Sequence, residues 1–278
     1  MKANTWVSKH FQKGKQVCLV TGGSSGIGLN YARSFAAMGC DLVLVSENRT
    51  ELEAVAKSIA MDYGVEVETI THDFTDPYGA PLLERRISEY RVGIFVSNAG
   101  FGMKGGFPAF SGDRYCDIIS CHVSYPTLLL RRILFSQSKE DPLLIINVVT
   151  INVLAPTPFT AVYTATKAYL LSLFQSVEAE FSDRPYLWHN MLPGTTDTPF
   201  HVKQGVIPQA MVMKPEEVVR RSLDNIGKRI FIPNRMDRAI APIFRILPSG
   251  AAMALAKFFL KRRLGVATGT HGAKEPAE

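Results

Sequence analysis

The chain has 278 residues, of which 46% are hydrophobic and 20% are charged. This balance is typical of a globular protein with a sizeable core and argues against a disordered or fibrous chain. The formal net charge is +6, and the basic residues are scattered without interleaved aromatic residues, which argues against nucleic-acid binding. The four cysteines show neither a C-x-x-C motif nor a metal-ligand spacing, so we expect reduced core thiols, no metal site and a cytoplasmic protein.

Residues 1–15, MKANTWVSKHFQKGK, are predicted to form a short polar lead. They contain no apolar stretch of the kind that a secretory signal requires. The chain nowhere runs through 18 consecutive apolar residues, so we expect no membrane-spanning helix.

The stretch VCLVTGGSSGIG, at 17–28, combines a predicted buried strand, a glycine-rich turn and the start of an apolar helical pattern. Gly22 permits a tight turn, Gly26 lets the backbone approach a pyrophosphate, and Gly28 lets the helix pack closely on the strand. The free N–H groups of a helix start favour an anion. The sequence therefore predicts a dinucleotide-binding turn, with the candidate residues Thr21, Gly22, Ser24, Ser25, Gly26, Ile27 and Gly28.

Further strands are predicted at 42–46, 65–70, 93–96, 143–149, 187–192 and 229–232, with helices between them. Thr50 and Glu53 have the spacing of a capping box, and Pro126 predicts a kink in a long helix at 114–134. This alternation predicts an α/β fold with a doubly wound parallel seven-stranded sheet of Rossmann type and helices on both faces. Polar residues follow several strands and are expected at one rim, among them Glu47, Asp73, Asn98, Thr150 and Pro193.

Tyr163 and Lys167 are four residues apart on a predicted helix and therefore share one face. A neighbouring ammonium stabilises a phenolate and is expected to lower the pKa of Tyr163. Such a pair can exchange a proton with a carbonyl or alcohol oxygen while a nicotinamide ring transfers hydride. The order of the turn G-x-x-x-G-x-G, the segment Asn98-Ala99-Gly100 and this Tyr–Lys pair resembles the short-chain dehydrogenase/reductase family over about residues 15–233.

The resemblance implies roles for individual residues. Tyr163 is the expected catalytic acid/base, and Lys167 is its expected activator and a hydrogen-bond donor to the nicotinamide ribose. Asp73 and Phe74 are expected near the adenine, and residues 98–100 along the adenosine side. The P-G-x-x-x-T segment is expected to hold the carboxamide, with the candidates Pro193, Gly194, Thr196 and Thr198. Residues 199–214 resemble the mobile substrate loop, and the helix that follows residue 158 resembles the one used in family dimers and tetramers, so we expect a homodimer or homotetramer.

Two positions depart from the family pattern. Thr150 stands where the family has the serine that binds the reacting oxygen, and threonine keeps the hydroxyl donor. His122 stands where the family has an asparagine that supports a water relay. A histidine can relay protons near neutral pH, or it can be a hydrogen-bonded core residue, and the sequence leaves both open.

The cofactor is expected to be NAD(P)(H), and the choice between NAD and NADP stays open. Ser46 and Glu47 end the second strand, and a glutamate there favours the ribose hydroxyl of NAD over a 2′-phosphate. Ser46 and Arg49 are also able to accommodate the phosphate.

We divide the chain into a catalytic domain at 1–233, an amphipathic helical extension at 234–264 on the same domain, and a disordered tail at 265–278. The extension is interpreted as a cover over the substrate pocket or an oligomer contact, with peripheral binding to a membrane surface as the alternative. The sequence thus predicts an NAD(P)(H)-dependent oxidoreductase that interconverts a ketone and a secondary alcohol on a small hydrophobic substrate. The alternative is a catalytically weak or inactive nucleotide-binding regulatory or scaffold protein of the same fold.

Overall fold

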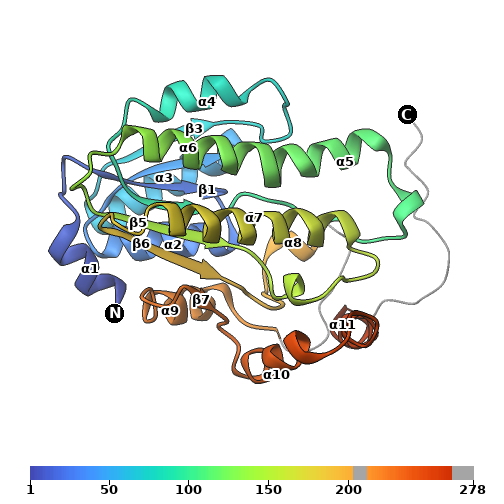
Figure 1. Ribbon diagram of the computed structural model, residues 1–278. Helices are drawn as coiled ribbons and strands as arrows, with labels where there is room; N and C mark the ends of the chain where they lie inside the picture. Colours follow the sequence, from blue (N-terminus) through green and yellow to red (C-terminus); the bar gives the residue numbers. More distant parts are fainter. Residues whose placement is uncertain (203–211, 265–278) are drawn as a thin grey trace.

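The computed structural model describes residues 1–202 and 212–264, and these form a single parallel sheet with helices on both sides (Figure 1). The strand order is β3-β2-β1-β4-β5-β6-β7, which confirms the predicted fold class. The strands are β1 (Val17–Thr21), β2 (Asp41–Ser46), β3 (Val67–Thr71), β4 (Val92–Ser97), β5 (Leu143–Val148), β6 (Tyr186–Met191) and β7 (Ile230–Phe231).

Alternate side chains of each central strand enter different cores, because successive residues of a strand point to opposite faces. Val20 packs in the core that is covered by α2 (Gly26–Ala37), α3 (Arg49–Tyr63) and α9 (Pro215–Leu223). Leu19 packs in the core under α4 (Ala80–Ile87), α6 (Tyr125–Ser136) and α7 (Ala161–Glu180). Burial on both faces explains why these strands read as continuous apolar runs.

The N-terminal segment differs from its prediction, because α1 (Ala3–His10) is a helix rather than a polar lead. Ala3, Trp6 and Val7 share one face and are 1–4% exposed in the core that also contains α2 and α9. Three apolar side chains at this spacing are enough to hold two helical turns against a core, although the remaining residues of the segment are polar.

The predicted capping box at the start of α3 is also wrong. Asn48 is the N-cap, and its side-chain oxygen accepts a hydrogen bond from the Glu51 N–H at 3.1 Å. Asparagine is as good an N-cap as threonine, and it precedes Thr50 in the chain, so the helix begins earlier than predicted.

The predicted long helix at 114–134 is divided into α5 (Gly112–Ile119), a π-helical turn η2 (Ser120–Ser124) and α6. The N–H of Tyr125 donates to the Ser120 oxygen, five residues earlier. Pro126 has no N–H to donate to the preceding turn, which favours a local departure from the α-helical pattern at this point. His122 lies in the middle of the π-turn.

The remaining described elements lie near the carboxyl ends of the strands: η1 (Phe107–Ala109), η3 (Ile151–Leu154), α8 (Pro199–Val202), α10 (Arg235–Ile246) and α11 (Ser249–Leu264). Helices α10 and α11 form the predicted extension and lie at the lower edge of Figure 1. Among the described residues, no helix is long and apolar enough to cross a membrane. The centre of the predicted substrate loop, 203–211, and the predicted tail, 265–278, lie outside the described residues.

Candidate active site

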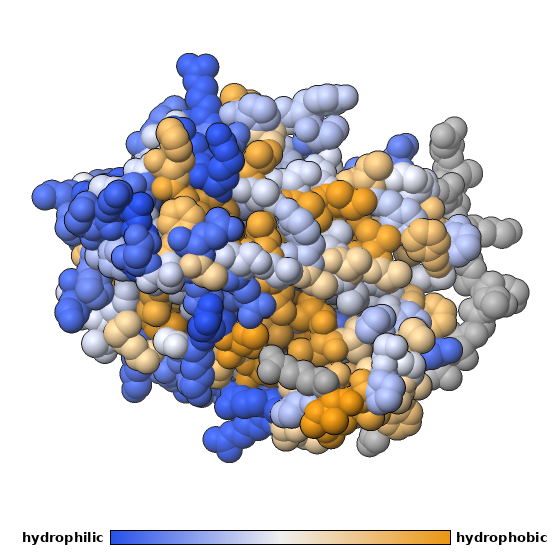
Figure 2. Space-filling view, viewed as in Figure 1, coloured by the Kyte–Doolittle hydropathy of each residue, from blue (hydrophilic) through white to orange (hydrophobic). Residues whose placement is uncertain are grey.

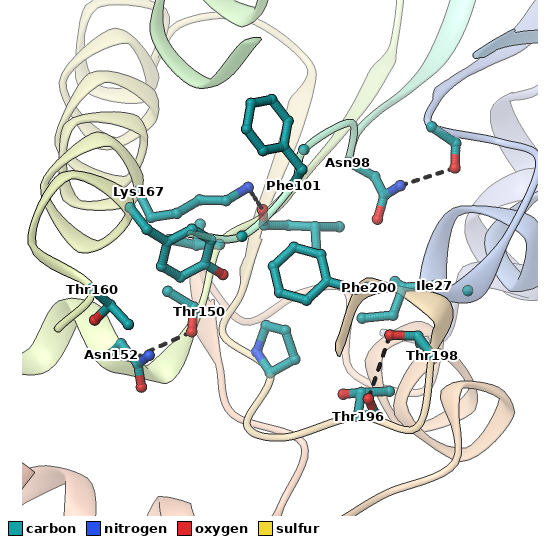
Figure 3. Close-up of a pocket in the computed structure, with 18 of the residues that line it drawn as sticks. Ile27, Asn98, Phe101, Thr150, Asn152, Thr160, Lys167, Thr196, Thr198 and Phe200 are labelled. Carbon is teal, nitrogen blue, oxygen red and sulfur yellow. Dashed lines mark hydrogen bonds between the residues drawn. The ribbon is translucent and has the colours of Figure 1, made fainter. Parts of the chain in front are cut away.

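A cleft of about 460 Å³ opens where the central strands end. Figure 3 shows Lys167, Thr150 and Asn152 on one side of it, Ile27 and Asn98 on the other, and Phe200 between them. The predicted residues that line the cleft are Gly22, Ser24, Ser25, Gly26, Ile27, Ser46, Glu47, Phe74, Asn98, Ala99, Gly100, Thr150, Tyr163, Lys167, Pro193, Gly194, Thr196 and Thr198. Segments from most of the chain length therefore meet in one place, as expected for the switch point of a doubly wound sheet.

The turn after β1 requires glycine at three positions. Gly22 and Gly26 have φ angles of 66° and 54°, in the left-handed region that favours glycine. A Cβ atom on Gly28 would overlap the carbonyl oxygen of Gly22, so the third glycine allows the start of α2 to lie against the turn. This geometry keeps side chains out of the space in front of the N–H groups that open α2, which fits the pyrophosphate of a dinucleotide.

Thr21 and Asn98 hold the ends of β1 and β4 together. The Thr21 hydroxyl accepts hydrogen bonds from the N–H groups of Asn98 and Ala99, at 3.0 and 3.1 Å, and donates to the Val96 oxygen at 3.3 Å. The Asn98 side chain donates to the oxygens of Thr21 and Gly22, at 3.0 and 3.2 Å. Thr21 does not line the cleft, and in this structure its hydroxyl positions the end of β4.

The end of β2 contributes Ser46 and Glu47 to the cleft, and the Ser46 hydroxyl is 2.9 Å from that of Ser24 in the glycine turn. Arg49 lies outside the cleft lining and pairs with Glu53 at 2.7 Å on the exposed surface of α3. Asp73 also lies outside the lining, and its carboxylate accepts hydrogen bonds from the N–H and hydroxyl of Thr75 at 2.8 Å. Phe74, the next residue, lines the cleft.

Tyr163 and Thr150 both line the cleft and lie close enough for Thr150 to affect the ionisation of the phenol. Burial raises the pKa of Tyr163 to about 12, and the Thr150 hydroxyl opposes that rise. The Thr150 hydroxyl also accepts a hydrogen bond from the Asn152 N–H at 3.3 Å (Figure 3). Thr150 is the N-cap of η3, and this bond fixes the orientation of its hydroxyl. Thr150 therefore contacts the predicted acid/base at the position that the family gives to serine.

Lys167 is 5% exposed, and its Nζ donates to the Val148 oxygen at 3.2 Å. Burial lowers the pKa of this lysine to about 8. The expected lowering of the Tyr163 pKa by Lys167 is wrong for this structure, because burial outweighs any effect of the ammonium on the phenol.

His122 is fully buried, with its ring centroid 5.7 Å from that of Tyr163, and both of its ring nitrogens have partners. Nε2 accepts the Phe101 N–H at 3.2 Å, and Nδ1 lies 3.0 Å from the Thr166 hydroxyl. That hydroxyl in turn donates to the backbone carbonyl oxygen of Tyr163. This network fits a neutral ring that carries its proton on Nδ1. Burial, followed by the charge of Lys167, holds the pKa of His122 well below its ordinary value. The geometry favours a hydrogen-bonded core histidine over a proton relay.

The segment after β6 borders the cleft next to the glycine turn. The Thr196 and Thr198 hydroxyls donate to the oxygens of Gly194 and Thr196, at 3.2 and 3.4 Å. A Cβ on Gly26 would lie 3.1 Å from the Thr198 methyl group, so this segment packs directly against the start of α2. Phe200 of α8 follows, with its ring centroid 5.9 Å from that of Tyr163.

Several lining residues carry no motif and are not among the individually predicted site residues, although those at 237–259 belong to the predicted extension. They are Phe101, Met103, Lys104, Arg114, Asn152, Thr157, Thr160, Asp237, Ile240, Phe244, Ala256 and Phe259. The spacing of 237, 240 and 244 along α10 is that of one helical face, and this was the one signal available for the extension. Helices α10 and α11 thus contribute to the lining of the cleft, and their role as a cover stays a prediction.

Comparison with known proteins gives the family. The model of the family described as short chain dehydrogenase matches residues 16–205. This chain belongs to the short-chain dehydrogenase family. The resemblance drawn from the glycine turn, residues 98–100 and the Tyr–Lys pair is confirmed, and the chain is a member of a family of NAD(P)-dependent oxidoreductases.

The chain is similar to a short-chain dehydrogenase from Sphingobium yanoikuyae solved in complex with NADPH, with 30% identity, a TM-score of 0.74, and coverage of 84% of this chain and 96% of that one. It is also similar to a bulky-bulky ketone specific alcohol dehydrogenase from Comamonas testosteroni, at 26% identity and a TM-score of 0.69, with 84% and 95% covered. The human inactive hydroxysteroid dehydrogenase-like protein 1 is 29% identical over 63% of this chain and 54% of its own length. The chain therefore spans about half the length of that curated relative.

Proposed function

We propose that this short-chain dehydrogenase interconverts a ketone and a secondary alcohol on a hydrophobic substrate, with NAD(P)(H) as the cofactor. The observation that carries the proposal is that Tyr163, Thr150 and Lys167 line one cleft together with the glycine turn. Tyr163 and Lys167 lie on α7, and Thr150 is the N-cap of η3.

A bound nicotinamide dinucleotide supplies or accepts the hydride. In the reductive direction, the Tyr163 hydroxyl donates its proton to the carbonyl oxygen of the substrate, and the Thr150 hydroxyl donates a hydrogen bond to the same oxygen. Lys167, protonated below about pH 8, keeps a positive charge next to the developing tyrosinate. The glycine turn, the Asn98 segment and the 193–198 segment would hold this cofactor.

The proposed substrate is hydrophobic because apolar side chains dominate the part of the cleft beyond Tyr163. Phe200, Ile240, Phe244 and Phe259 come from α8, α10 and α11 and lie around this part of the cleft. The similarity to a bulky-ketone alcohol dehydrogenase supports a ketone with large substituents on both sides.

Two observations favour different nicotinamide cofactors. Glu47 lines the cleft at the end of β2, where a carboxylate favours the ribose 2′-hydroxyl of NAD and repels a 2′-phosphate. The Sphingobium relative was solved with NADPH. The proposal therefore covers both nucleotides, and the titration below decides between them.

A second candidate is a nucleotide-binding protein without turnover. It is favoured by the raised pKa of Tyr163 and by the similarity to a human relative whose name describes it as inactive. Such a protein would keep the cofactor cradle and use it for regulation or assembly.

The test is a titration of wild type and Tyr163→Phe with NADH and NADPH, followed by nicotinamide fluorescence. Both proteins should bind one nucleotide with equal affinity, and a mixed pool of bulky hydrophobic ketones should oxidise it on wild type only. We expect Tyr163→Phe to lower the oxidation rate by about 10²–10⁴-fold, the contribution of a general acid. Equal binding with no oxidation by either protein favours the second candidate. No binding of either nucleotide rejects both.

A further inference from the structure

The loop between β4 and η1 is fixed against the substrate side of the cleft. The Gly105 N–H donates to the Phe159 oxygen at 2.9 Å, just before the start of α7, which carries Tyr163. Phe159 has a φ of 66°, an uncommon and costly conformation for an aromatic residue, and it persists only where surrounding contacts impose it. Lys257 of α11 lies 5.8 Å from the Phe159 ring. The loop is thus held near both α7 and the cover.

Lys104 extends from this loop into the cleft lining and is half-buried. Burial lowers the pKa of Lys104 to about 8, and no carboxylate among the described residues counteracts that shift. Among the described residues, the Lys104 ammonium forms neither an ion pair nor a hydrogen bond. A partly desolvated ammonium without a partner is unfavourable, and an anion brought by a ligand would relieve this cost.

Arg114 supplies a second cation from α5. Its guanidinium lies 4.6 Å from the centroid of the Phe101 ring, in the same loop as Lys104, and it pairs with Asp117 at 3.3 Å. Arg114 also lines the cleft. The acidic lining residues Glu47 and Glu51 lie at the adenosine end, and Asp237 is buried on α10. The loop side of the cleft therefore carries the positive charge.

We propose that Lys104, together with Arg114, binds an anionic group of the substrate, either a carboxylate or a phosphate, so that the substrate is an amphipathic anion rather than a neutral lipid. This inference rests on the proposed function, since it assigns the polar end of the molecule whose ketone reacts at Tyr163. It adds a charged subsite to a cleft whose other walls on this side are largely apolar.

The experiment uses full-length protein saturated with the nucleotide that it binds, so that the glycine turn is occupied. Calorimetry then compares three ligands with the same chain below their micellar concentrations: decanoate, decyl phosphate and decan-1-ol. Wild type should bind one anionic ligand at least about tenfold more tightly than decan-1-ol, a ratio that corresponds to about 1.4 kcal/mol. A preference for decanoate assigns a carboxylate, and a preference for decyl phosphate assigns a phosphate.

Lys104→Met should remove this preference and leave the affinity for decan-1-ol unchanged, whereas Lys104→Arg should retain it. Lys139→Met, which changes an exposed lysine outside the cleft, is the matched control and should behave as wild type. Equal affinity for all three ligands, no binding of the anionic ligands, or a preference that survives Lys104→Met overturns the inference. Nucleotide binding and ketone oxidation are measured on the same samples, so failure of the proposed function is detected separately.

Discussion

Lys167 is a lysine whose ammonium is enclosed by the protein and donates a hydrogen bond to the Val148 oxygen at 3.2 Å. Burial lowers the pKa of Lys167 to about 8 from an ordinary value of 10.5. Holding this group charged at neutral pH opposes folding, because desolvation penalises the charged form. The fold tolerates that cost at the one position where the proposed reaction needs a positive charge beside a phenol.

The pH dependence of stability should reveal this cost. Because the folded pKa is lower than the unfolded one, the unfolded chain binds more protons between about pH 8 and 10.5, and unfolding free energy rises with pH. We expect the titration of Lys167 to raise the unfolding free energy by about 1 kcal/mol between pH 7.5 and 9. Urea unfolding of Lys167→Met should lack that part of the rise and show greater stability than wild type at pH 7.5. Lys139→Met is the control, and identical pH profiles for wild type and Lys167→Met contradict the prediction.

Single residues were predictable where a type and a spacing carry the chemistry. Tyr163, Lys167 and Thr150 follow from their order in the chain, and the structure brings them together. Their ionisation was not predictable in the same way, because burial of Tyr163 depends on neighbours such as Phe200 from a distant segment. Arg49 and Asp73 show the same limit: each follows a strand, but their side chains bond to Glu53 and Thr75 outside the cleft.

Among the elements, α1 shows how a short helix can be part of the core without a strong sequence signal. Its three buried side chains pack in the cluster that contains α2 and α9. Trp6 is the largest of them and is 3% exposed. Helix α1 therefore packs on the same face of the sheet as α2. The N-terminus of α2 points to the cleft.

Trp6→Ala should lower the unfolding free energy by about 3–5 kcal/mol, because it removes a buried aromatic side chain and leaves a cavity. Tyr78→Ala changes an aromatic residue that is 88% exposed and should shift the free energy by less than about 0.5 kcal/mol. Urea unfolding followed by circular dichroism measures both. Equal small effects of the two substitutions would show that α1 is not part of the stable core.

The sequence predicts every strand of the sheet within a few residues of its observed bounds. Most of the strands are apolar runs, whereas β3, VETIT, alternates apolar and polar residues over most of its length. The sequence missed the π-turn around His122, since apolar periodicity does not separate one wide turn from an α-helical one. It also missed α1 and the N-cap at Asn48, where the deciding contacts involve few residues.

At the scale of the whole molecule, the helical cover α10–α11 is apolar on two sides. Ile240, Phe244 and Phe259 face the cleft. Large apolar side chains are also exposed on the outside of the same helices: Met236 at 60%, Ile243 at 46%, Ile246 at 83%, Met253 at 42% and Phe258 at 55%. Figure 2 shows apolar side chains gathered in the lower part of this face, where Figure 1 places these helices. An outer apolar surface on a substrate cover suits contact with lipid or with a second copy of the chain.

The basic residues Lys257, Lys261, Arg262 and Arg263 in the sequence of α11 favour the lipid surface, and we expect wild type to sediment with vesicles that contain anionic lipid and not with zwitterionic ones. Ile246→Asp combined with Phe258→Asp should lower the partition coefficient by about tenfold or more, because two apolar side chains no longer enter the bilayer. Phe135→Asp removes an aromatic residue of α6 that is 76% exposed and should leave sedimentation unchanged. The outer face is an oligomer contact instead if wild type sediments with neither type of vesicle, if light scattering shows that it is a homodimer or homotetramer, and if the double variant is a monomer.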